Sequence, residues 1–155
     1  MKEPIISVSG LRGIVGETLT PDVAIRYVCA FASTLPEGPI VITRDGRTTG
    51  RMLANALFSG LCATGRNVID ADIAATPTTG VLVRQHGAAG GVQISASHNP
   101  PPYNGLKLFG KEGRILTAAA GEPVTERYRS GVMTWIAHDH VGEVAPCEDT
   151  IREHG

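Results

Sequence analysis

The sequence has few cysteines, few aromatic residues and no long hydrophobic run. Its 155 residues include three cysteines, and no two of them form a CxxC pair. An odd number of widely separated cysteines favours neither a disulfide framework nor a zinc site, and it is typical of a reduced compartment. Aromatic residues make up 5% of the chain, which is too few for a surface that stacks nucleic-acid bases.

An excess of charge of one sign is also missing. The formal net charge of −1 at pH 7 gives no reason to expect a nucleic acid or an anionic membrane surface as a partner. No apolar stretch approaches the roughly 18 residues that a transmembrane helix needs. The charged N-terminus is not followed by the apolar region of a signal peptide. We therefore expect a cytoplasmic protein that binds neither nucleic acid nor membrane.

Two glycine-rich nucleotide-binding patterns are absent as well. The chain contains neither GxGxxG nor GxxxxGK[ST], which argues against Rossmann-type cofactors and P-loop nucleotides. What it does contain is an ordinary globular composition, 42% hydrophobic and 19% charged. A chain of this length is sufficient for one domain with a sizeable core.

Strand-like and helix-like segments alternate along the chain. The apolar run at 39–43 predicts a buried strand, and Thr20 followed by Pro21 is a typical helix start. A second helix is predicted over 51–64, ending at Gly65. The alternation with short connections predicts an α/β protein, a three-layer α/β/α sandwich with a mostly parallel mixed sheet. The other predicted elements are strands over 5–8, 68–71, 92–95 and 106–109, and a helix over 76–85.

The C-terminal end has a different character. Residues 138–146 are polar and rich in turn formers, and the helical pattern at 148–154 stops after about two turns, which is too short for a stable helix by itself. We therefore expect a domain over residues 1–140, with 141–155 forming a linker and the start of a second domain that this chain lacks.

The most distinctive segment is Ser-Ala-Ser-His-Asn-Pro at 95–100, directly after a predicted strand. Ligands of α/β proteins bind at such strand ends. A hydrolase dyad of Ser97 and His98 is disfavoured, because consecutive residues of an extended chain point to opposite faces and the GxSxG pattern is absent. A phosphorylated Ser97 fits better, since His98, Asn99 and Lys107 would supply donors and cations for its phosphate. A polar turn without chemistry uses the same residue types, and the local pattern leaves both interpretations open.

Basic residues near predicted strand ends are further candidates. Lys107 lies between Leu106 and Leu108, so it faces the polar side of its strand, either as a charge or proton carrier beside a phosphate or as a solvated lysine. Arg44 and Arg47 flank an Asp-Gly turn at a helix start, where free amides attract anions. Solvated arginines at a simple turn account for that pattern equally well.

Arg12 lies between two glycines in the segment 9–13, which is predicted to be a loop. Glycines allow the backbone to approach a ligand closely, and Arg12 could then bind a phosphoryl oxygen. An ordinary loop arginine explains the isolated pattern as well. Thr48 and Thr49 are expected to cap the helix that follows Arg47.

Taken together, these segments resemble the first domain of the α-D-phosphohexomutases, the family of phosphoglucomutase, phosphomannomutase and phosphoglucosamine mutase. The resemblance implies a phosphoenzyme in which Ser97 donates its phosphoryl group to a hexose phosphate. Ser97 then recovers the other phosphoryl group from a hexose 1,6-bisphosphate intermediate. The matching segments, in order along the chain, are 9–16, 44–50, 75–78 and 94–107.

The resemblance also implies roles for individual residues. Arg12 and Lys107 would assist proton transfer and stabilise the transferring group, and His98 would shape the phosphoserine loop. Mg²⁺ would bind through the phosphate of Ser97, with its remaining ligands in an Asp-Gly-Asp-x-Asp-Arg loop of a second domain that this chain lacks. The residues implied in catalysis are Ser97, Lys107, Arg12 and His98, and those implied in phosphate or substrate binding are Asn99, Arg47 and Arg44.

The implied reaction interconverts hexose 1-phosphate and hexose 6-phosphate, with mannose or glucose phosphate as the expected substrate. Two alternatives remain: a phosphoglucosamine mutase domain, and a non-catalytic phosphate-binding module of the same fold. The expected partners are the phosphosugar and the missing domains of the same chain, which would recognise the sugar. We expect residues 1–155 alone to be inactive or nearly so.

Overall fold

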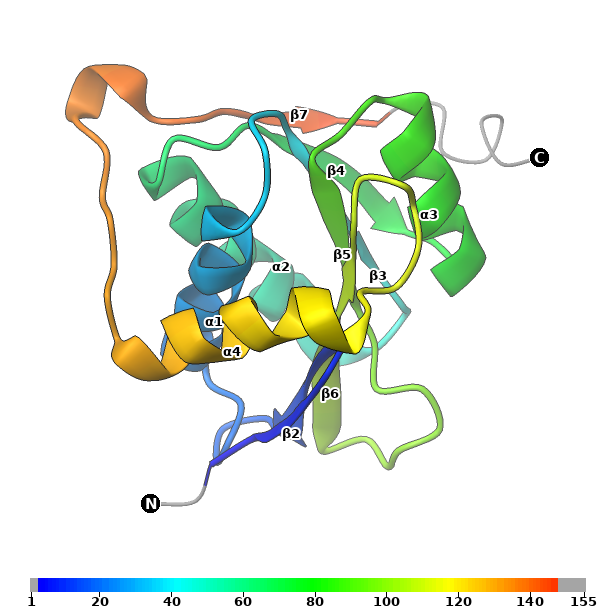
Figure 1. The fold of residues 1–155 in the computed structure, drawn as a ribbon. Helices are drawn as coiled ribbons and strands as arrows, with labels where there is room; N and C mark the ends of the chain where they lie inside the picture. Colours follow the sequence, from blue (N-terminus) through cyan, green and yellow to red (C-terminus); the bar gives the residue numbers. More distant parts are fainter. Residues whose placement is uncertain (1–2, 148–155) are drawn as a thin grey trace.

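The computed structural model describes residues 3–147, which form a sheet with helices on both faces (Figure 1). The strands are β1 (Ile5–Ser7), β2 (Gly10–Ile14), β3 (Ile40–Arg44), β4 (Val68–Ile73), β5 (Gly90–Ile94), β6 (Tyr103–Phe109) and β7 (Val144–Pro146). The helices are α1 (Pro21–Ser33), α2 (Thr48–Ala63), α3 (Thr76–Gln85), α4 (Ala118–Ser130) and the short 3₁₀ turn η1 (His138–His140).

The strands form one mixed sheet in the order β1-β2-β6-β5-β3-β4-β7. β3 pairs in parallel with both β4 and β5, and β7 pairs in parallel with β4. β6 is antiparallel to both β5 and β2, and β1 is antiparallel to β2. Of the strands in residues 3–147, therefore, only β1 and β6 run against the others. The predicted α/β fold with a mostly parallel mixed sheet is confirmed.

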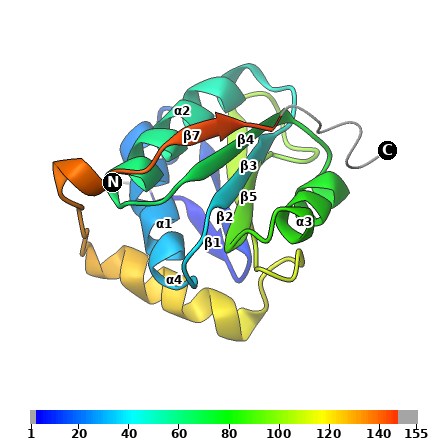
Figure 2. The same cartoon turned by 90° about the horizontal axis from the view of Figure 1, so that it is seen from above.

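The helices form two layers, one on each face of the sheet (Figure 2). The larger hydrophobic cluster joins α1, α2 and α4 to one face, and a smaller cluster joins α3 to the other. β3 shows why its sequence is apolar throughout: Ile40 and Ile42 belong to the larger cluster, and Val41 belongs to the smaller one. The predicted three-layer arrangement is confirmed. None of the helices within residues 3–147 is both long enough and apolar enough to cross a membrane.

The predicted starts of α1 and α3 are confirmed, whereas α2 begins at Thr48 and not at the predicted residue 51. The predicted capping contacts are not all present. Thr20 is the N-cap residue of α1, yet its hydroxyl donates to the Asp22 carboxylate and makes no side-chain cap bond. Arg47 is the N-cap residue of α2, and Thr48 is its first helical residue. The predicted capping of α2 by Thr48 or Thr49 is therefore wrong.

Residues 10–13 of the segment predicted as a loop belong to a strand, so the loop prediction is wrong for them, while Ser9 lies in a turn. Gly10–Ile14 pairs with β6 along its whole length. The glycines carry no hydropathy signal, which hides the alternation of buried Leu11 with exposed Arg12. A Cβ atom at Gly10 would lie 2.2 Å from the Leu106 carbonyl oxygen, so only glycine permits this close approach of the two backbones.

Strand β7 extends the sheet within the segment expected to be a linker. Val144–Pro146 pairs with the outer edge of β4, and the Cys147 amide donates to the Asp70 carbonyl at 2.8 Å. Part of 141–155 therefore adds a strand to the first domain, because the edge of β4 offers unpaired backbone groups. The helical pattern predicted at 148–154 lies outside the described residues.

The sequence pattern does not indicate helix α4. It includes Gly121 and Pro123, two poor helix formers, and buries little besides Val124 and Tyr128. Tyr128 meets Tyr27 of α1 edge to face, with 5.6 Å between ring centroids. Packing on α1 and the sheet therefore stabilises this helix, and residue preference does not.

Gly121 provides a test of that packing. A Cβ atom there would lie 1.8 Å from the Val8 carbonyl oxygen. Gly121→Ala should therefore lower the free energy of unfolding by about 1–3 kcal/mol, although the same change in an exposed helix raises it by roughly 1 kcal/mol. Urea unfolding measures the difference, and Glu122→Ala, at the exposed neighbouring position, is the matched control. A more stable Gly121→Ala protein would show that α4 does not contact the β1–β2 turn in this way.

Candidate functional site

The Ser97 loop connects two antiparallel neighbours, β5 and β6, over residues 95–102. Hydrogen bonds within the loop hold its first turn: the Ser97 amide donates to Ser95 Oγ at 3.1 Å. The Asn99 amide and the Asn99 side chain both donate to the Ala96 carbonyl, at 3.1 and 2.8 Å. The loop therefore begins with a turn that is stabilised by its own hydrogen bonds, and this turn places Ser97 at a defined position.

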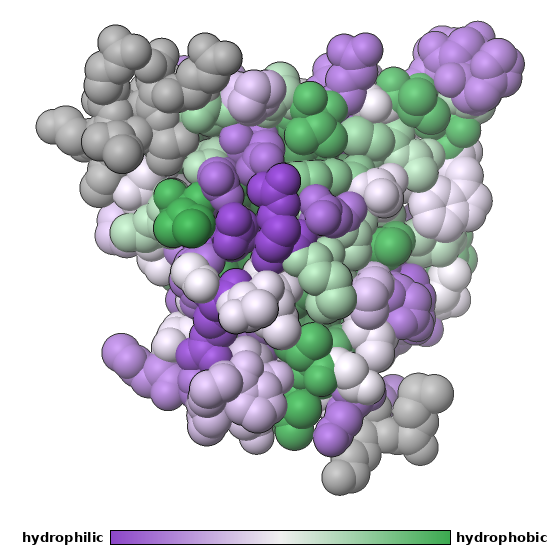
Figure 3. All heavy atoms as spheres, turned by 180° about the vertical axis from the view of Figure 1, so that it is seen from behind, coloured by the Kyte–Doolittle hydropathy of each residue, from purple (hydrophilic) through white to green (hydrophobic). Residues whose placement is uncertain are grey.

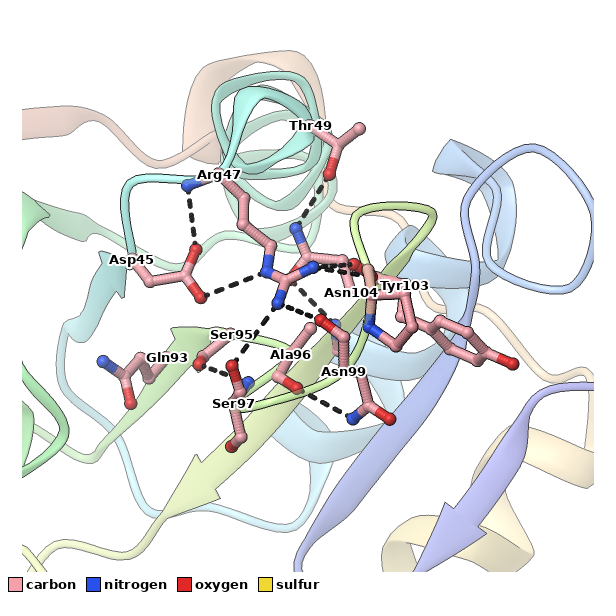
Figure 4. A network of polar contacts seen from close by, with 12 residues as sticks. Asp45, Arg47, Thr49, Gln93, Ser95, Ala96, Ser97, Asn99, Tyr103 and Asn104 are labelled. Carbon is pink, nitrogen blue, oxygen red and sulfur yellow. Dashed lines mark hydrogen bonds and ion pairs between the residues drawn. The ribbon is translucent and has the colours of Figure 1, made fainter.

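Ser97 has a left-handed backbone, with φ of 55°, and its side chain is exposed. This conformation costs a non-glycine residue about 1–2 kcal/mol. Strained non-glycine residues cluster at functional sites, and of the two such residues in the described part of the chain, Asp72 and Ser97, Ser97 lines the hollow described next. Figure 4 shows the Ser97 side chain on the opposite side of the loop from Arg47.

A hollow of about 170 Å³ opens beside this loop. Ser97 and Asn99 line it from the loop, Arg12 lines it from β2, and Lys107 lines it from β6. His98 is exposed and does not line it. The structure therefore brings together four of the predicted site residues, which come from strands β2 and β6 and from the loop that connects β5 to β6.

Strand register explains how the two cations meet. Gly10 lies opposite Lys107 and Arg12 lies opposite Gly105, so Arg12 and Lys107 are diagonal neighbours on one face. Such neighbours are typically about 7–8 Å apart. Helix α3, the only helix on that face within residues 3–147, packs mainly against β3 and β5 and less extensively against β6, and this leaves the β2 region open. The site therefore lies where the outer helical layer ends.

Arg12 and Lys107 are chemically available. Within residues 3–147, no hydrogen bond or ion pair engages the Arg12 guanidinium or the Lys107 ammonium group. Two uncompensated positive charges in one hollow attract an anion, and a guanidinium group matches phosphate geometry. The hollow therefore suits a phosphate group close to the hydroxyl of Ser97.

Arg44 has a different environment. Its guanidinium group donates to the Asp72 carboxylate at 2.8 Å, and Arg51 approaches the same carboxylate at 4.0 Å. Arg44 is not among the residues that line the hollow. Its role in phosphate binding stays a prediction.

On the side of the molecule seen from behind, hydrophilic residues gather in the middle of the surface (Figure 3).

Arg47 contacts the Ser97 loop through its guanidinium group but does not line the hollow. Its Nη1 donates to the carbonyl oxygens of Pro100 at 2.8 Å and Tyr103 at 3.2 Å. Its Nη2 donates to those of Asn99 and of Ser97, the latter at 3.4 Å. The predicted position beside the loop is therefore correct, while the predicted phosphate contact stays a prediction.

Sequence reasoning gave no role to Ser95 or Asn104. Ser95 holds the Ser97 amide, and a serine two residues before the residue of interest is a signal for such a turn. Asn104 is fully buried, and its side-chain Nδ2 donates to Oγ1 of Thr49, at the start of α2, at 2.9 Å. That contact joins segments far apart in the sequence, and no local pattern indicates it.

A complete Mg²⁺ site does not fit the described residues. Residues 3–147 contain no group of three His, Cys, Asp or Glu side chains that could hold a metal ion together. Mg²⁺ takes oxygen ligands in near-octahedral geometry. This domain could therefore offer such an ion at most a phosphate oxygen on Ser97.

Comparison with known proteins identifies the family. A family profile described as phosphoglucomutase/phosphomannomutase, alpha/beta/alpha domain I, matches residues 4–133. The chain belongs to this family. The matched segment is domain I of the phosphohexomutases. Members of this family are isomerases of carbohydrate metabolism and typically depend on Mg²⁺.

Individual relatives agree with this assignment. A protein of Pyrococcus horikoshii named probable phosphoglucosamine mutase is 42% identical over 134 residues, which cover 86% of this chain and 30% of the relative. A Synechococcus protein named phosphoglucosamine mutase is 40% identical over 138 residues, 88% of this chain and 30% of its own length. The chain thus spans about a third of the curated relatives that it matches.

A solved structure agrees as well. A phosphoglucomutase/phosphomannomutase family protein of Burkholderia thailandensis has a TM-score of 0.76 and 25% sequence identity. The match covers 96% of this chain and 35% of that protein. The phosphohexomutase resemblance predicted from the motifs is confirmed.

The left-handed backbone of Ser97 can be tested by substitution. Ser97→Gly should raise the free energy of unfolding by up to about 1 kcal/mol, because glycine adopts positive φ without strain. Ser97→Val should lower it, since a β-branched residue is disfavoured there. Urea unfolding compares them with Ser59→Gly, a change in the middle of α2 that should be destabilising. A loss of stability in Ser97→Gly comparable to that in Ser59→Gly would contradict the left-handed conformation.

Proposed function

We propose that Ser97 is the phosphoryl carrier of a mutase that interconverts glucosamine 1-phosphate and glucosamine 6-phosphate. The observation that supports it best is that one hollow is lined by Ser97 and by two cations, Arg12 and Lys107, which have no ion-pair or hydrogen-bond partner for their charged groups among residues 3–147. Phosphoryl transfer depends mainly on positioning and on charge compensation, and this hollow offers both.

Each half of the reaction exchanges one bond to phosphorus for another. In the first half, the bond between Ser97 Oγ and phosphorus breaks while a sugar hydroxyl oxygen forms a bond to the same phosphorus. The proton of that hydroxyl passes to Ser97 Oγ, and Lys107 can relay it because an ammonium group exchanges protons. Arg12 stays charged throughout and stabilises the transferring phosphoryl group. In the second half, the bond between the other phosphorus and its sugar oxygen breaks while Ser97 Oγ forms a bond to that phosphorus, and the proton of the Ser97 hydroxyl passes to the sugar oxygen.

The proposed sugar differs from the mannose or glucose phosphate expected from the motifs. The two relatives described above, at 42% and 40% identity, both carry the name phosphoglucosamine mutase, and this favours the glucosamine alternative. We assign sugar recognition and the remaining Mg²⁺ ligands to further domains of the working enzyme, because the curated relatives are about three times as long as the matched segment.

Replacement of domain I in a relative tests the role of Ser97. The chain should support mutase activity when it takes the place of the matched 30% of the Pyrococcus horikoshii protein. Ser97→Ala should lower that activity at least about 1,000-fold, since the phosphoryl acceptor is lost. Ser59→Ala, an exposed serine of α2, should leave the activity unchanged.

The phosphorylation state of the same chimera separates an enzyme from a binding module. Peptide mass spectrometry after incubation with glucosamine 1,6-bisphosphate should find one phosphoryl group, located on Ser97. A folded chimera whose Ser97 remains unmodified would instead support the non-catalytic phosphate-binding module.

The choice of sugar needs the protein expressed from the complete reading frame that contains this chain. We expect kcat/KM for glucosamine 1-phosphate to exceed that for mannose 1-phosphate and glucose 1-phosphate by at least about tenfold, the discrimination that one lost polar contact produces. Coupled assays with each sugar measure it. Equal or higher values for mannose or glucose phosphate would return the assignment to the phosphomannomutase or phosphoglucomutase reaction.

A further inference from the structure

The Arg47 guanidinium group donates hydrogen bonds to carbonyl oxygens of the Ser97 loop. It donates to three of them, those of Ser97, Asn99 and Pro100, and to the carbonyl oxygen of Tyr103, the first residue of β6. Figure 4 shows the group pointing into the curve of the loop, with these carbonyls turned toward it. A loop of this length has few partners of its own for its carbonyls, and one planar cation satisfies several of them at once.

The position of Arg47 is itself held firmly. It is the N-cap residue of α2, so its backbone belongs to a rigid element. The Asp45 carboxylate accepts from the Arg47 amide at 3.0 Å through Oδ1, and its Oδ2 lies 3.8 Å from Nε. The Arg47 side chain keeps only 21% of its surface exposed. The helix start and Asp45 together fix the direction of the guanidinium group.

This contact has an electrostatic consequence for the hollow. Carbonyl oxygens carry partial negative charge and repel a phosphate dianion. By drawing four of them to its own side, Arg47 keeps them away from the side on which the Ser97 hydroxyl lies. The cations of the hollow then act on a phosphate without competition from the carbonyls that Arg47 binds.

We propose that Arg47, oriented by Asp45, is a positioning residue that holds the Ser97 loop in its observed conformation, with a left-handed backbone at Ser97 and with carbonyl oxygens directed toward Arg47. In this role Arg47 does not contact the substrate phosphate. The effect on phosphoryl transfer rests on the proposed function, whereas the effect on loop conformation does not. A displacement of about 1 Å at a reacting group can cost about 100-fold in rate, so loss of Arg47 should be visible in catalysis without removing any reacting group.

The first experiment compares backbone amide resonances of the ¹⁵N-labelled chain for the native protein, Arg47→Ala and Arg47→Lys. In Arg47→Ala, the amides of Ser97 and Asn99 should shift and broaden while those of β3 and β5 keep their positions. Arg47→Lys should lie between the two, because an ammonium group has three donors and lacks the planar geometry. Arg51→Ala is the matched control, since Arg51 lies one helical turn further along α2 and pairs with Asp72.

The second experiment measures the rate at which Ser97 accepts a phosphoryl group from glucosamine 1,6-bisphosphate in the domain-replacement chimera. Arg47→Ala should slow it about 100-fold, Arg47→Lys should be less affected, and added guanidinium ion should restore part of the rate in Arg47→Ala only. Arg51→Ala should match the native protein. A residue that only stabilised the fold would leave the rate for folded protein unchanged and would give no rescue by guanidinium.

The two measurements separate the two proposals. Ser97 and Asn99 resonances that superpose in Arg47→Ala and the native protein would overturn the positioning role. If Arg47→Ala does not fold, the Arg47→Lys spectrum decides in the same way. If the native chimera accepts no phosphoryl group while Arg47→Ala still shifts the loop amides, the proposed function fails and the positioning of the loop by Arg47 stands.

Discussion

The pairing of β6 with two neighbours is the constraint on which the site depends. β6 is antiparallel to β5 and to β2, so the chain must reverse directly after β5, and the residues of that reversal include Ser97. The same pairing places Lys107 beside Gly10 and brings Arg12 to the same face. One set of backbone hydrogen bonds thus determines where the hydroxyl and both cations lie.

The basic residues fall into two groups, those with carboxylate or carbonyl partners and those without. Arg44 and Arg47 have carboxylate or carbonyl partners, and so does Arg66, which donates to four carbonyls at the end of α1 and in the segment that connects it to β3. Arg12 and Lys107 have none within the described residues. A partnered cation stabilises the fold, whereas an unpartnered cation in a hollow retains its attraction for a ligand. Sequence alone does not separate these two groups, because the partners of Arg44, Arg47 and Arg66 lie on segments far away along the chain.

Much of the fold could be predicted from local patterns, and the errors have physical causes. The apolar run of β3 and the Thr20-Pro21 helix start indicate their elements correctly, because burial and a proline at the first helical position leave a local signal. The strand at Gly10–Ile14 was mistaken for a loop because glycine shows no hydropathy alternation. Helix α4 was missed because its stability comes from contacts such as that between Tyr128 and Tyr27. Strand β7 is determined by the open edge of β4 and not by its own three residues.

The sequence by itself determined the alternation of elements, the α/β class, the motif that contains Ser97 and the family that the motif indicates. These properties depend on residue type and spacing along the chain, which are local. The tertiary structure alone decided that Arg12 and Lys107 share a hollow with Ser97, that His98 lies outside it, and that Arg47 contacts loop carbonyls. Those outcomes depend on strand register and on the direction of side chains across neighbouring strands, and they arise only when distant segments pair.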